Sequence, residues 1–243
     1  MECVMTAAAL AKRAARIANK YKTLYVMGCI GAPMNEANQQ RYIDNYPYNR
    51  QSARAALIRA ADGETYGFDC VCLIKGILWG WCADQNAAYG GAKYASNGVP
   101  DVDADGMIAL CRDLSADFSQ LSVGEALWTG GHIGLYVGGG LAVECTPRWQ
   151  NGVQLTAVEN LGPKTGYPSR RWLRHGKLPW VDYGQTAQPT LADEALLARA
   201  ICWATEAGLI PEDGFNPDAP CTKGEMVEML FRLHGGNQRA GAS

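Results

Sequence analysis

The chain has 243 residues, of which 48% are hydrophobic and 19% are charged, and its formal net charge at pH 7 is −2. This composition is typical of a soluble globular protein rather than a disordered or fibrous one, and the length allows one sizeable domain and a small one. The small net charge gives no electrostatic footprint for nucleic acid, so no nucleic-acid partner is expected.

The N-terminal region has no recognisable export signal. Lys12, Arg13, Arg16 and Lys20 interrupt the Ala and Leu residues of segment 1–22, so no continuous apolar stretch forms. The sequence also contains no stretch close to the ~20 apolar residues that a membrane-spanning helix needs. We therefore expect synthesis in the cytoplasm without a signal peptide, and no membrane partner.

Nine cysteines are present, an odd number, so at least one thiol cannot pair within the chain. Their spacing contains no C-x-x-C pair of the kind that zinc ribbons use. Cys70, Cys72 and Cys82 could form part of a metal cluster, but no nearby histidine would complete it. Because buried free cysteine behaves as a small hydrophobe, we expect packing roles for most of them and a reducing compartment.

An amphipathic helix is predicted over residues 6–22, where Leu10, Ala14, Ile17 and Tyr21 recur at spacings of three and four. Its basic side chains take the other face, which we interpret as a solvated surface.

The next elements are short. Segment 25–31 is predicted to be extended and ends in glycines, and the polar residues 34–50 are interpreted as a long loop or insertion. A second short helix is predicted over 51–61. Its expected apolar stripe comprises Ala53, Ala56, Leu57 and Ala60.

A central apolar helix is expected to begin at Asp69 or Cys70 and to continue to Trp81. Residues 86–100, rich in Gly and Asn, are predicted to be loop, and residues 107–111 to be helical.

Three strands are predicted next, over 131–138, 141–145 and 152–158, and Gly139-Gly140 is a strong hairpin signal between the first two. Helices followed by consecutive hairpin strands indicate an α+β domain built on an antiparallel sheet.

The composition shifts near residue 184. We assign residues 1–183 to a large domain, 184–190 to a linker of small and polar residues, 191–236 to a small all-helical module and 237–243 to a tail.

Cys70 is the strongest candidate for chemistry, because Tyr66-Gly67-Phe68-Asp69-Cys70 leads directly into an apolar helix. Unpaired N–H groups and the positive end of the dipole at a helix N-terminus favour thiolate, the nucleophilic form of cysteine. A lone cysteine is still more often structural, so a partner base is required.

The histidines of the chain are His132, His175 and His234. His132 opens a predicted strand between Gly131 and Gly134, which leave room for a ligand, whereas structural or surface roles suit the other two. Glu144 lies on the facing strand of the hairpin, where a carboxylate can hold the imidazole. Together with Cys70 these residues give a nucleophile, a base and an orienting group.

Y-G-F-D-C before an apolar helix, followed by G-H-I-G-L-Y-V-G-G-G-L-A-V-E, resembles the NlpC family of cell-wall cysteine peptidases, within the papain-like group that also holds the CHAP amidases. Segment 25–31 resembles the Tyr-x-x-Gly-Gly element that precedes the nucleophile in that family. The resemblance extends from residue 6 to about residue 158 and implies a papain-like α+β fold.

The resemblance assigns roles by position. Cys70 matches the nucleophile, His132 the base and Glu144 the polar third residue, which is more often His, Asn or Gln in this family and Glu in the CHAP pattern. Tyr25 and Asp69 match positions that line the substrate cleft.

Val71 and Cys72 stand where the family usually has Ser-Gly. Cys72 lies two residues after Cys70 on the predicted helix, so its side chain is expected to point away from Cys70 and to pack in the protein interior. Trp128 and Trp149 are candidates for side chains that line the substrate groove. The alternative is that they pack in the core.

The implied reaction is acyl transfer to water on peptide bonds of bacterial peptidoglycan, next to γ-D-glutamate, without a metal or organic cofactor. The alternatives are a CHAP-like amidase that cuts between muramic acid and L-alanine, an acyltransferase of the same fold, and a wall-binding protein without activity.

The module at residues 191–236 is similar to an S-layer homology module, a type that binds secondary cell-wall polymers. The matching segments are Trp203-Ala204, Phe215-x-Pro217 and Thr222-Lys223-Gly224-Glu225. A secondary wall polymer is therefore an expected partner, and the alternative is a helical hairpin that packs or forms a homo-oligomer. A lytic domain with a wall-binding module and no signal peptide resembles a phage or prophage endolysin, which acts on the wall after holin-type release.

Overall fold

The computed structural model describes residues 5–184, 204 and 227. The chain divides into two compact units, residues 1–184 and 185–243. Apart from residues 184, 204 and 227, the predicted linker, helical module and tail lie outside the described residues.

In the described part of the chain, the helices are α1 (Ala7–Lys20), α2 (Glu36–Asn45), α3 (Pro47–Arg50), α4 (Ser52–Ala60), α5 (Cys70–Leu78) and α6 (Ala104–Leu110), with 3-10 helices η1 (Phe118–Gln120) and η2 (Glu159–Leu161). The strands there are β1 (Met5–Thr6), β2 (Thr23–Tyr25), β3 (Ile30–Pro33), β4 (Tyr66–Phe68), β5 (Arg112–Ser115), β6 (Ala126–Thr129), β7 (His132–Gly138), β8 (Leu141–Thr146), β9 (Gly152–Val158), β10 (Ser169–Arg170), β11 (Arg174–Lys177) and β12 (Val181–Asp182).

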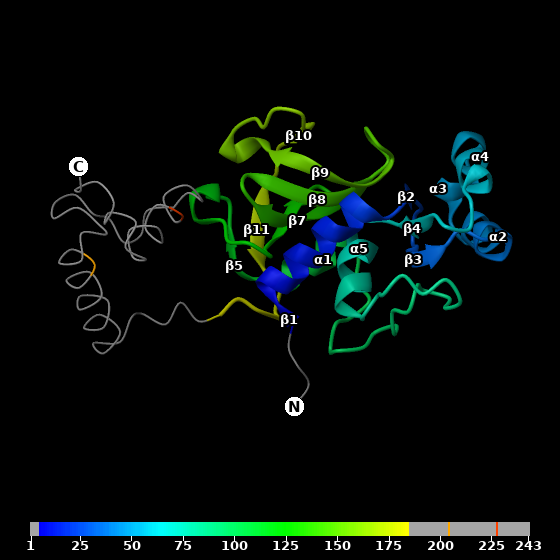
Figure 1. The fold of residues 1–243 in the computed structure, drawn as a ribbon, viewed down its shortest axis with the longest axis horizontal. Helices are drawn as coiled ribbons and strands as arrows, with labels where there is room; N and C mark the ends of the chain where they lie inside the picture. The colour runs from blue at the N-terminus through cyan, green and yellow to red at the C-terminus, as the bar shows by residue number, and fades with distance from the viewer. Residues whose placement is uncertain (1–4, 185–203, 205–226, 228–243) are drawn as a thin grey trace, which may run out of the picture. The chain divides into compact units, whose positions relative to one another are not determined.

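A seven-stranded sheet in the order β10-β9-β8-β7-β6-β11-β5 forms the centre of this unit. Its neighbouring strands are antiparallel except β9 and β10, which are parallel. The helices α1 and α5 pack against β7 and β8 (Figure 1). The predicted α+β class with an antiparallel sheet is confirmed.

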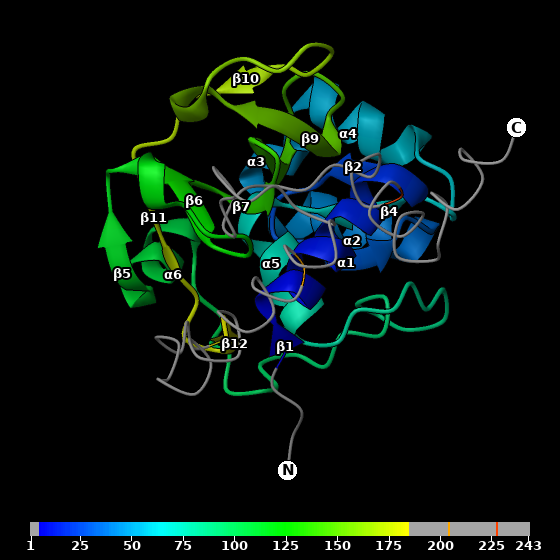
Figure 2. The ribbon, with the colours of Figure 1, turned by 60° about the vertical axis from the view of Figure 1, so that its left-hand side comes forward.

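A small sheet, β2-β4-β3, lies between this central layer and the helices α2, α3 and α4. Figure 1 places these three helices beside β3 and β4, away from β5 and β11, and in Figure 2 α2 and α4 again lie near β4. The apolar side chains between them form a second core cluster, which includes Val26, Met34, Tyr42 and Ile58. The domain thus has a subsidiary core next to the start of α5.

The first helix has the expected extent and face. The Thr6 hydroxyl accepts a hydrogen bond from the backbone N–H of Ala9 at 3.2 Å, which caps the N-terminus of α1. Leu10, Ala14 and Ile17 are buried in the main core. The amphipathic spacing therefore identified both the helix and its buried face.

The prediction of a loop over residues 34–50 is wrong, because α2 and α3 occupy most of this segment. The Asn35 side chain caps α2 by accepting a hydrogen bond from Asn38 N–H at 3.0 Å. Tyr42 and Ile43 bury one face of α2 in the second core cluster. The polar composition concealed a helix that needs only a narrow apolar stripe.

The helix α4 is confirmed, but its predicted stripe is wrong. Ala53, Ala56, Leu57 and Ala60 are all exposed. The buried positions are Arg54, Ala55 and Ile58. The reason is a buried cation: one Arg54 guanidinium nitrogen (Nη1) donates to the Asn151 side chain at 2.8 Å, and the other (Nη2) donates to the carbonyl of Tyr25.

The central helix begins at Cys70 as predicted but ends at Leu78 rather than Trp81. Beyond it, the Trp81 indole N–H donates to the Gly31 carbonyl at 2.8 Å and fixes the following segment. Residues 86–100 contain no helix or strand, as expected, and α6 begins three residues before the predicted helix, at the Asp103 cap.

The three predicted strands correspond to β7, β8 and β9, and β7 and β8 form the predicted antiparallel hairpin. Gly139 and Gly140 have φ values of 62° and 77°, the left-handed region that hairpin turns require. In the seven-stranded sheet the strands β5, β6, β10 and β11 were not predicted, and neither were β1, β4 and β12 outside it. No helix within the described residues has the length and apolar character needed to cross a membrane.

Candidate active site

Asp69 fixes the start of the helix that carries Cys70. Its Oδ1 accepts a hydrogen bond from Cys72 N–H at 2.7 Å, which caps α5. Its Oδ2 accepts a hydrogen bond from Gly28 N–H at 2.8 Å and fastens the turn between β2 and β3 to the helix. Asp69, predicted to line the substrate cleft, therefore also holds two neighbouring segments together.

The Cys70 side chain is 8% exposed at the first position of α5. Burial raises the pKa of its thiol to about 12, and the charge of Asp69 acts in the same direction. The backbone N–H groups of Ile133, Val71 and Cys70 itself act to lower the pKa. The N–H groups of the helix start thus favour thiolate as expected, but burial outweighs them and the resting group is a thiol.

His132 and Glu144 form the pair that the hairpin pattern predicted. Gly134 on β7 is in register with Glu144 on β8, and His132 is two residues from Gly134, on the same face of the strand. His132 Nε2 lies 2.7 Å from Glu144 Oε2. The exposed fraction of the side chain is 16% for His132 and zero for Glu144. With Nε2 held by the carboxylate, Nδ1 is the ring nitrogen that is free to exchange a proton.

The fold brings Cys70 next to the start of β7, because α5 packs directly against this strand. The backbone N–H of Ile133, the residue after His132, is one of the groups that act to lower the pKa of the Cys70 thiol. No direct hydrogen bond between Cys70 and the His132 ring is present among the described residues. Catalytic hydrogen bonds are often long before substrate binds, so this geometry is compatible with a nucleophile and its base.

Glu144 has two further partners that the sequence did not reveal. Arg170 Nε lies 2.7 Å from Glu144 Oε2 and 2.9 Å from Oε1, and Thr156 Oγ1 donates to Oε1 at 2.7 Å. Burial acts to raise the pKa of Glu144, but the hydrogen bonds from His132 and Arg170 outweigh it and the pKa lies below its ordinary value. Glu144 is therefore held as a carboxylate next to Nε2 of the imidazole.

Trp172 stacks on the His132 ring, with the ring centroids 5.7 Å apart and the planes inclined by 13°. A Cβ at Gly134 would lie 2.8 Å from the Trp172 ring. The expected role of Gly134, to leave room for a ligand, is therefore wrong: the missing side chain makes room for Trp172. At Gly131 (φ 73°) no atom beyond its chain neighbours lies within 4 Å of the Cβ position, so the space at this glycine is open.

Trp128 lies on β6, half-buried, and is in register with Ile133 on β7. Its indole N–H donates to Asp105 Oδ1 at 2.7 Å, and the same oxygen accepts from Gly131 N–H at 3.0 Å. Trp128 therefore helps to hold the turn that precedes His132. Trp149, the second candidate for the groove wall, is 46% exposed and its ring faces the Arg170 guanidinium at 5.2 Å.

Tyr25 is buried at the end of β2, next to Cys70. Burial raises the pKa of its hydroxyl, and the neighbouring Cys70 and Asp69 add to this effect. Its ring makes an edge contact with Tyr48 at 5.9 Å. The structure thus brings Tyr25 and Asp69 together around the start of α5, with His132, Glu144 and Trp128 on the facing strands.

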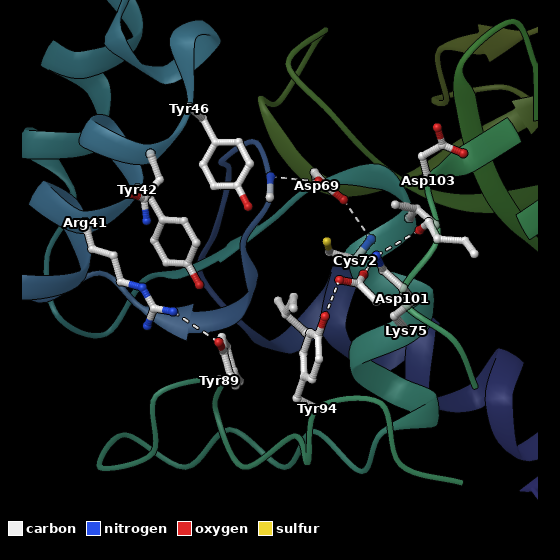
Figure 3. Close-up of a pocket in the computed structure, with 15 residues that line it drawn as sticks. Arg41, Tyr42, Tyr46, Asp69, Cys72, Lys75, Tyr89, Tyr94, Asp101 and Asp103 are labelled. Atoms are coloured by element: carbon white, nitrogen blue, oxygen red, sulfur yellow. Dashed lines mark hydrogen bonds and ion pairs between the residues drawn. The ribbon is translucent and has the colours of Figure 1, made fainter. Parts of the chain in front are cut away.

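A cavity of about 510 Å³ opens beside the N-terminus of α5 (Figure 3). Asp69, Val71 and Cys72 line it, but Cys70 itself does not. Tyrosines and charged groups form most of the rest of its wall: Arg41, Tyr42, Tyr46, Lys75, Tyr89, Tyr94, Asp101 and Asp103. The cavity therefore adjoins the candidate nucleophile without containing its sulfur.

Of the other described cysteines, four have the buried positions expected for packing roles. Cys29, Cys72, Cys111 and Cys145 are buried and free, whereas Cys82 is free and exposed. Cys72 is buried as expected, although it also lines the cavity. Within the described residues, no three His, Cys, Asp or Glu side chains are grouped as metal ligands.

His175 has a structural place in β11. Its Nδ1 is paired with the buried Glu125 carboxylate, and its Nε2 lies 2.9 Å from the Asp117 carbonyl oxygen. His234, for which a structural or surface role was also expected, lies outside the described residues.

Comparisons of the chain with protein-family models, curated proteins and solved structures found no match.

Proposed function

We propose that the chain is a cysteine hydrolase of bacterial peptidoglycan with a papain-like catalytic domain, which cleaves stem-peptide bonds next to γ-D-glutamate. In this proposal Cys70 is the nucleophile, His132 is the base and Glu144 orients the imidazole. The substrate assignment rests on the resemblance of the Cys70 and His132 segments to the NlpC family.

The observation that carries the chemistry is the His132–Glu144 pair next to a cysteine at a helix start. The 2.7 Å contact at Nε2 leaves Nδ1 to accept the Cys70 proton. The α5–β7 packing supports this geometry, because it puts the cysteine against the strand that His132 begins. A buried carboxylate on the far side of the imidazole stabilises the imidazolium that forms.

The reaction begins from thiol and neutral imidazole. His132 removes the proton from Cys70 as the sulfur attacks the peptide carbonyl, and a C–S bond forms. The backbone N–H groups of Cys70 and Val71 are suited to stabilise the developing oxyanion. The imidazolium then protonates the leaving amine as the C–N bond breaks. Water, deprotonated by His132, releases the acyl group as a carboxylic acid and restores the thiol.

One observation favours a second candidate, an amidase that cuts between muramic acid and L-alanine. The orienting residue is Glu144, and glutamate in this role is closer to the CHAP pattern. The catalytic residues would be the same, and only the bond that is cut would differ.

Wall attachment and release are separate proposals. Residues 191–236 would bind a secondary wall polymer or mediate self-association, and the enzyme would reach the wall after holin-type release, as an endolysin does. These proposals rest on the resemblance of the C-terminal segment and on the order of the two domains.

Digestion of purified peptidoglycan, followed by mass spectrometry of the soluble fragments, tests the proposal. We expect the parent protein to release peptides cut next to γ-D-glutamate, and Cys70→Ala to release none. Cys82→Ala, at a free and exposed cysteine that does not line the cavity, is the matched control and should retain most of the activity. Glycan chains freed of peptide would instead identify the amidase, and a Cys70→Ala variant as active as the parent would refute the assignment.

A further inference from the structure

The cavity beside α5 contains a guanidinium, that of Arg41, whose charge is not neutralised by any carboxylate of the described residues. Arg41 projects from α2 into this cavity (Figure 3). Among the described residues it forms no ion pair, whereas the other cation of the cavity wall, Lys75, is paired with Asp101 and donates to the Val102 carbonyl at 2.9 Å.

Aromatic contacts hold Arg41 in position. Its Nη2 donates to the Tyr89 hydroxyl at 3.1 Å, and its guanidinium carbon lies 5.5 Å from the Tyr89 ring centroid and 5.6 Å from that of Tyr42. Contacts with aromatic faces orient an arginine without placing an anion beside it. The guanidinium of Arg41 is therefore already oriented, and its remaining N–H groups are available to a ligand.

The carboxylates of the cavity wall have partners of their own. Asp69 accepts hydrogen bonds from two backbone N–H groups, Asp101 accepts from Lys75 and from the Tyr94 hydroxyl, and Asp103 caps α6. A ligand carboxylate that entered the cavity near Arg41 would meet the positive charge of its guanidinium. The three acidic side chains would keep the hydrogen bonds that they already make. A planar guanidinium matches the two oxygens of a carboxylate.

We propose that Arg41 binds a free carboxylate of the peptide substrate and makes the cavity its recognition site. This inference rests on the proposed function, because it takes the ligand to be a stem peptide. Two carboxylates of such a peptide share this chemistry: the α-carboxylate of the γ-linked D-glutamate and the carboxylate at the C-terminus.

Three synthetic stem peptides distinguish these sources: one with both carboxylates free, one with the glutamate α-carboxylate amidated and one with the C-terminus amidated. We expect Arg41→Met to lower kcat/KM about 10- to 100-fold on peptides that keep the recognised carboxylate, as for loss of a charge-assisted hydrogen bond. On the peptide in which that carboxylate is amidated, the variant and the parent should be equally active.

Arg41→Lys should lose less than Arg41→Met, because it keeps the charge but not the fork of two donors. Arg59→Met, at an exposed arginine of α4, is the matched control and should change none of the three rates. An equal loss on all three peptides, or no loss on any of them, would overturn the assignment of Arg41.

Calorimetric binding of the same peptides to Cys70→Ala separates this inference from the proposed reaction. If the parent cleaves none of the peptides but Cys70→Ala binds them with the same dependence on Arg41 and on one carboxylate, the recognition site stands and the hydrolase assignment fails. Binding that is indifferent to Arg41 would refute the site whether or not cleavage occurs.

Discussion

At the scale of single residues, the candidate site depends on a buried carboxylate with two basic partners. Glu144 contacts His132 at 2.7 Å and Arg170 at 2.7 Å, and its side chain is fully buried. Arg170 compensates the charge of Glu144, and Oε2 of the Glu144 carboxylate also contacts the imidazole. Removal of Arg170 would leave a buried charge without its main partner.

We therefore predict that Arg170→Met lowers the free energy of unfolding by about 3–5 kcal/mol, the usual cost of breaking a buried ion pair. The double variant Arg170→Met/Glu144→Gln should be more stable than Arg170→Met alone, because it no longer buries an uncompensated charge. Urea denaturation measures both effects.

The control for this prediction is the next residue, Arg171, whose ion pair with Glu159 is exposed at 3.7 Å. Arg171→Met should change the unfolding free energy by less than about 1 kcal/mol. If the double variant were no more stable than Arg170→Met, the charge of Glu144 would not be the source of the loss.

The sequence was sufficient to single out Cys70, His132 and Glu144, because a helix start and a glycine hairpin are local patterns. Arg170 and Trp172 could not be found in this way. They reach His132 and Glu144 only because β10 pairs with β9 and the chain then returns along the sheet, and no local spacing encodes that return.

At the scale of elements, Asp69 links the reactivity of Cys70 to the start of α5. Its carboxylate caps the helix, holds Gly28 and acts to raise the pKa of the Cys70 thiol. An amide in its place can accept only one of the two backbone N–H bonds and carries no charge.

We predict that Asp69→Asn lowers the unfolding free energy by about 1–2 kcal/mol and speeds the alkylation of Cys70 by iodoacetamide at pH 8–9. The faster alkylation follows from a lower thiol pKa, which gives more thiolate at a fixed pH. Peptide mapping by mass spectrometry, at several times of reaction, measures the rate at Cys70.

Asp103→Asn supplies the matched control, because Asp103 caps α6 through Gly106 N–H at 2.7 Å. It should lower the stability without a change in the alkylation of Cys70. An equal increase of the alkylation rate in both variants would point to loosened packing rather than to the charge of Asp69.

The helices show where pattern reading succeeds and fails. In α1, buried and exposed positions alternate with strong contrast, and its extent and face were predicted. In α2 the buried face is narrow, and in α4 it contains Arg54, so polarity no longer reports which side is buried. Both helices are stabilised by tertiary contacts that the local sequence does not display.

At the scale of the whole molecule, buried thiols make the fold sensitive to alkaline pH. Burial raises the pKa of Cys29, Cys70 and Cys111 from 9.0 to about 12. In the unfolded chain these thiols ionise near pH 9, whereas in the folded chain they stay protonated until about pH 12. The stability they contribute is complete below pH 9 and is lost as the pH rises towards 12.

We predict that the unfolding free energy falls between pH 9 and 11 by about 1 kcal/mol per pH unit for each such thiol. Thermal denaturation at a series of pH values in the presence of a reductant measures this decline. Cys111→Ala should reduce its slope. A melting temperature that stays constant from pH 8 to pH 10.5 would contradict the assignment of these thiols as buried and protonated.

The order of strands in the seven-stranded sheet was beyond prediction. The hairpins β6–β7–β8–β9 follow the chain, but β11 pairs with both β5 and β6 after the chain has passed through β10. Such long-range pairing is set by the packing of the whole domain, while the α+β class follows from the succession of helices and hairpin strands.

In the proposed mechanism, the sulfur of Cys70 and the imidazole of His132 act as one unit. Covalent labelling with a γ-D-glutamyl peptide that ends in an acyloxymethyl ketone tests it most directly, with tandem mass spectrometry locating the adduct. We predict a single adduct on Cys70 and a labelling rate at least ~100-fold lower in His132→Ala, the usual contribution of a general base. An adduct on Cys72 or Cys82, or equal labelling of His132→Ala and the parent, would contradict it.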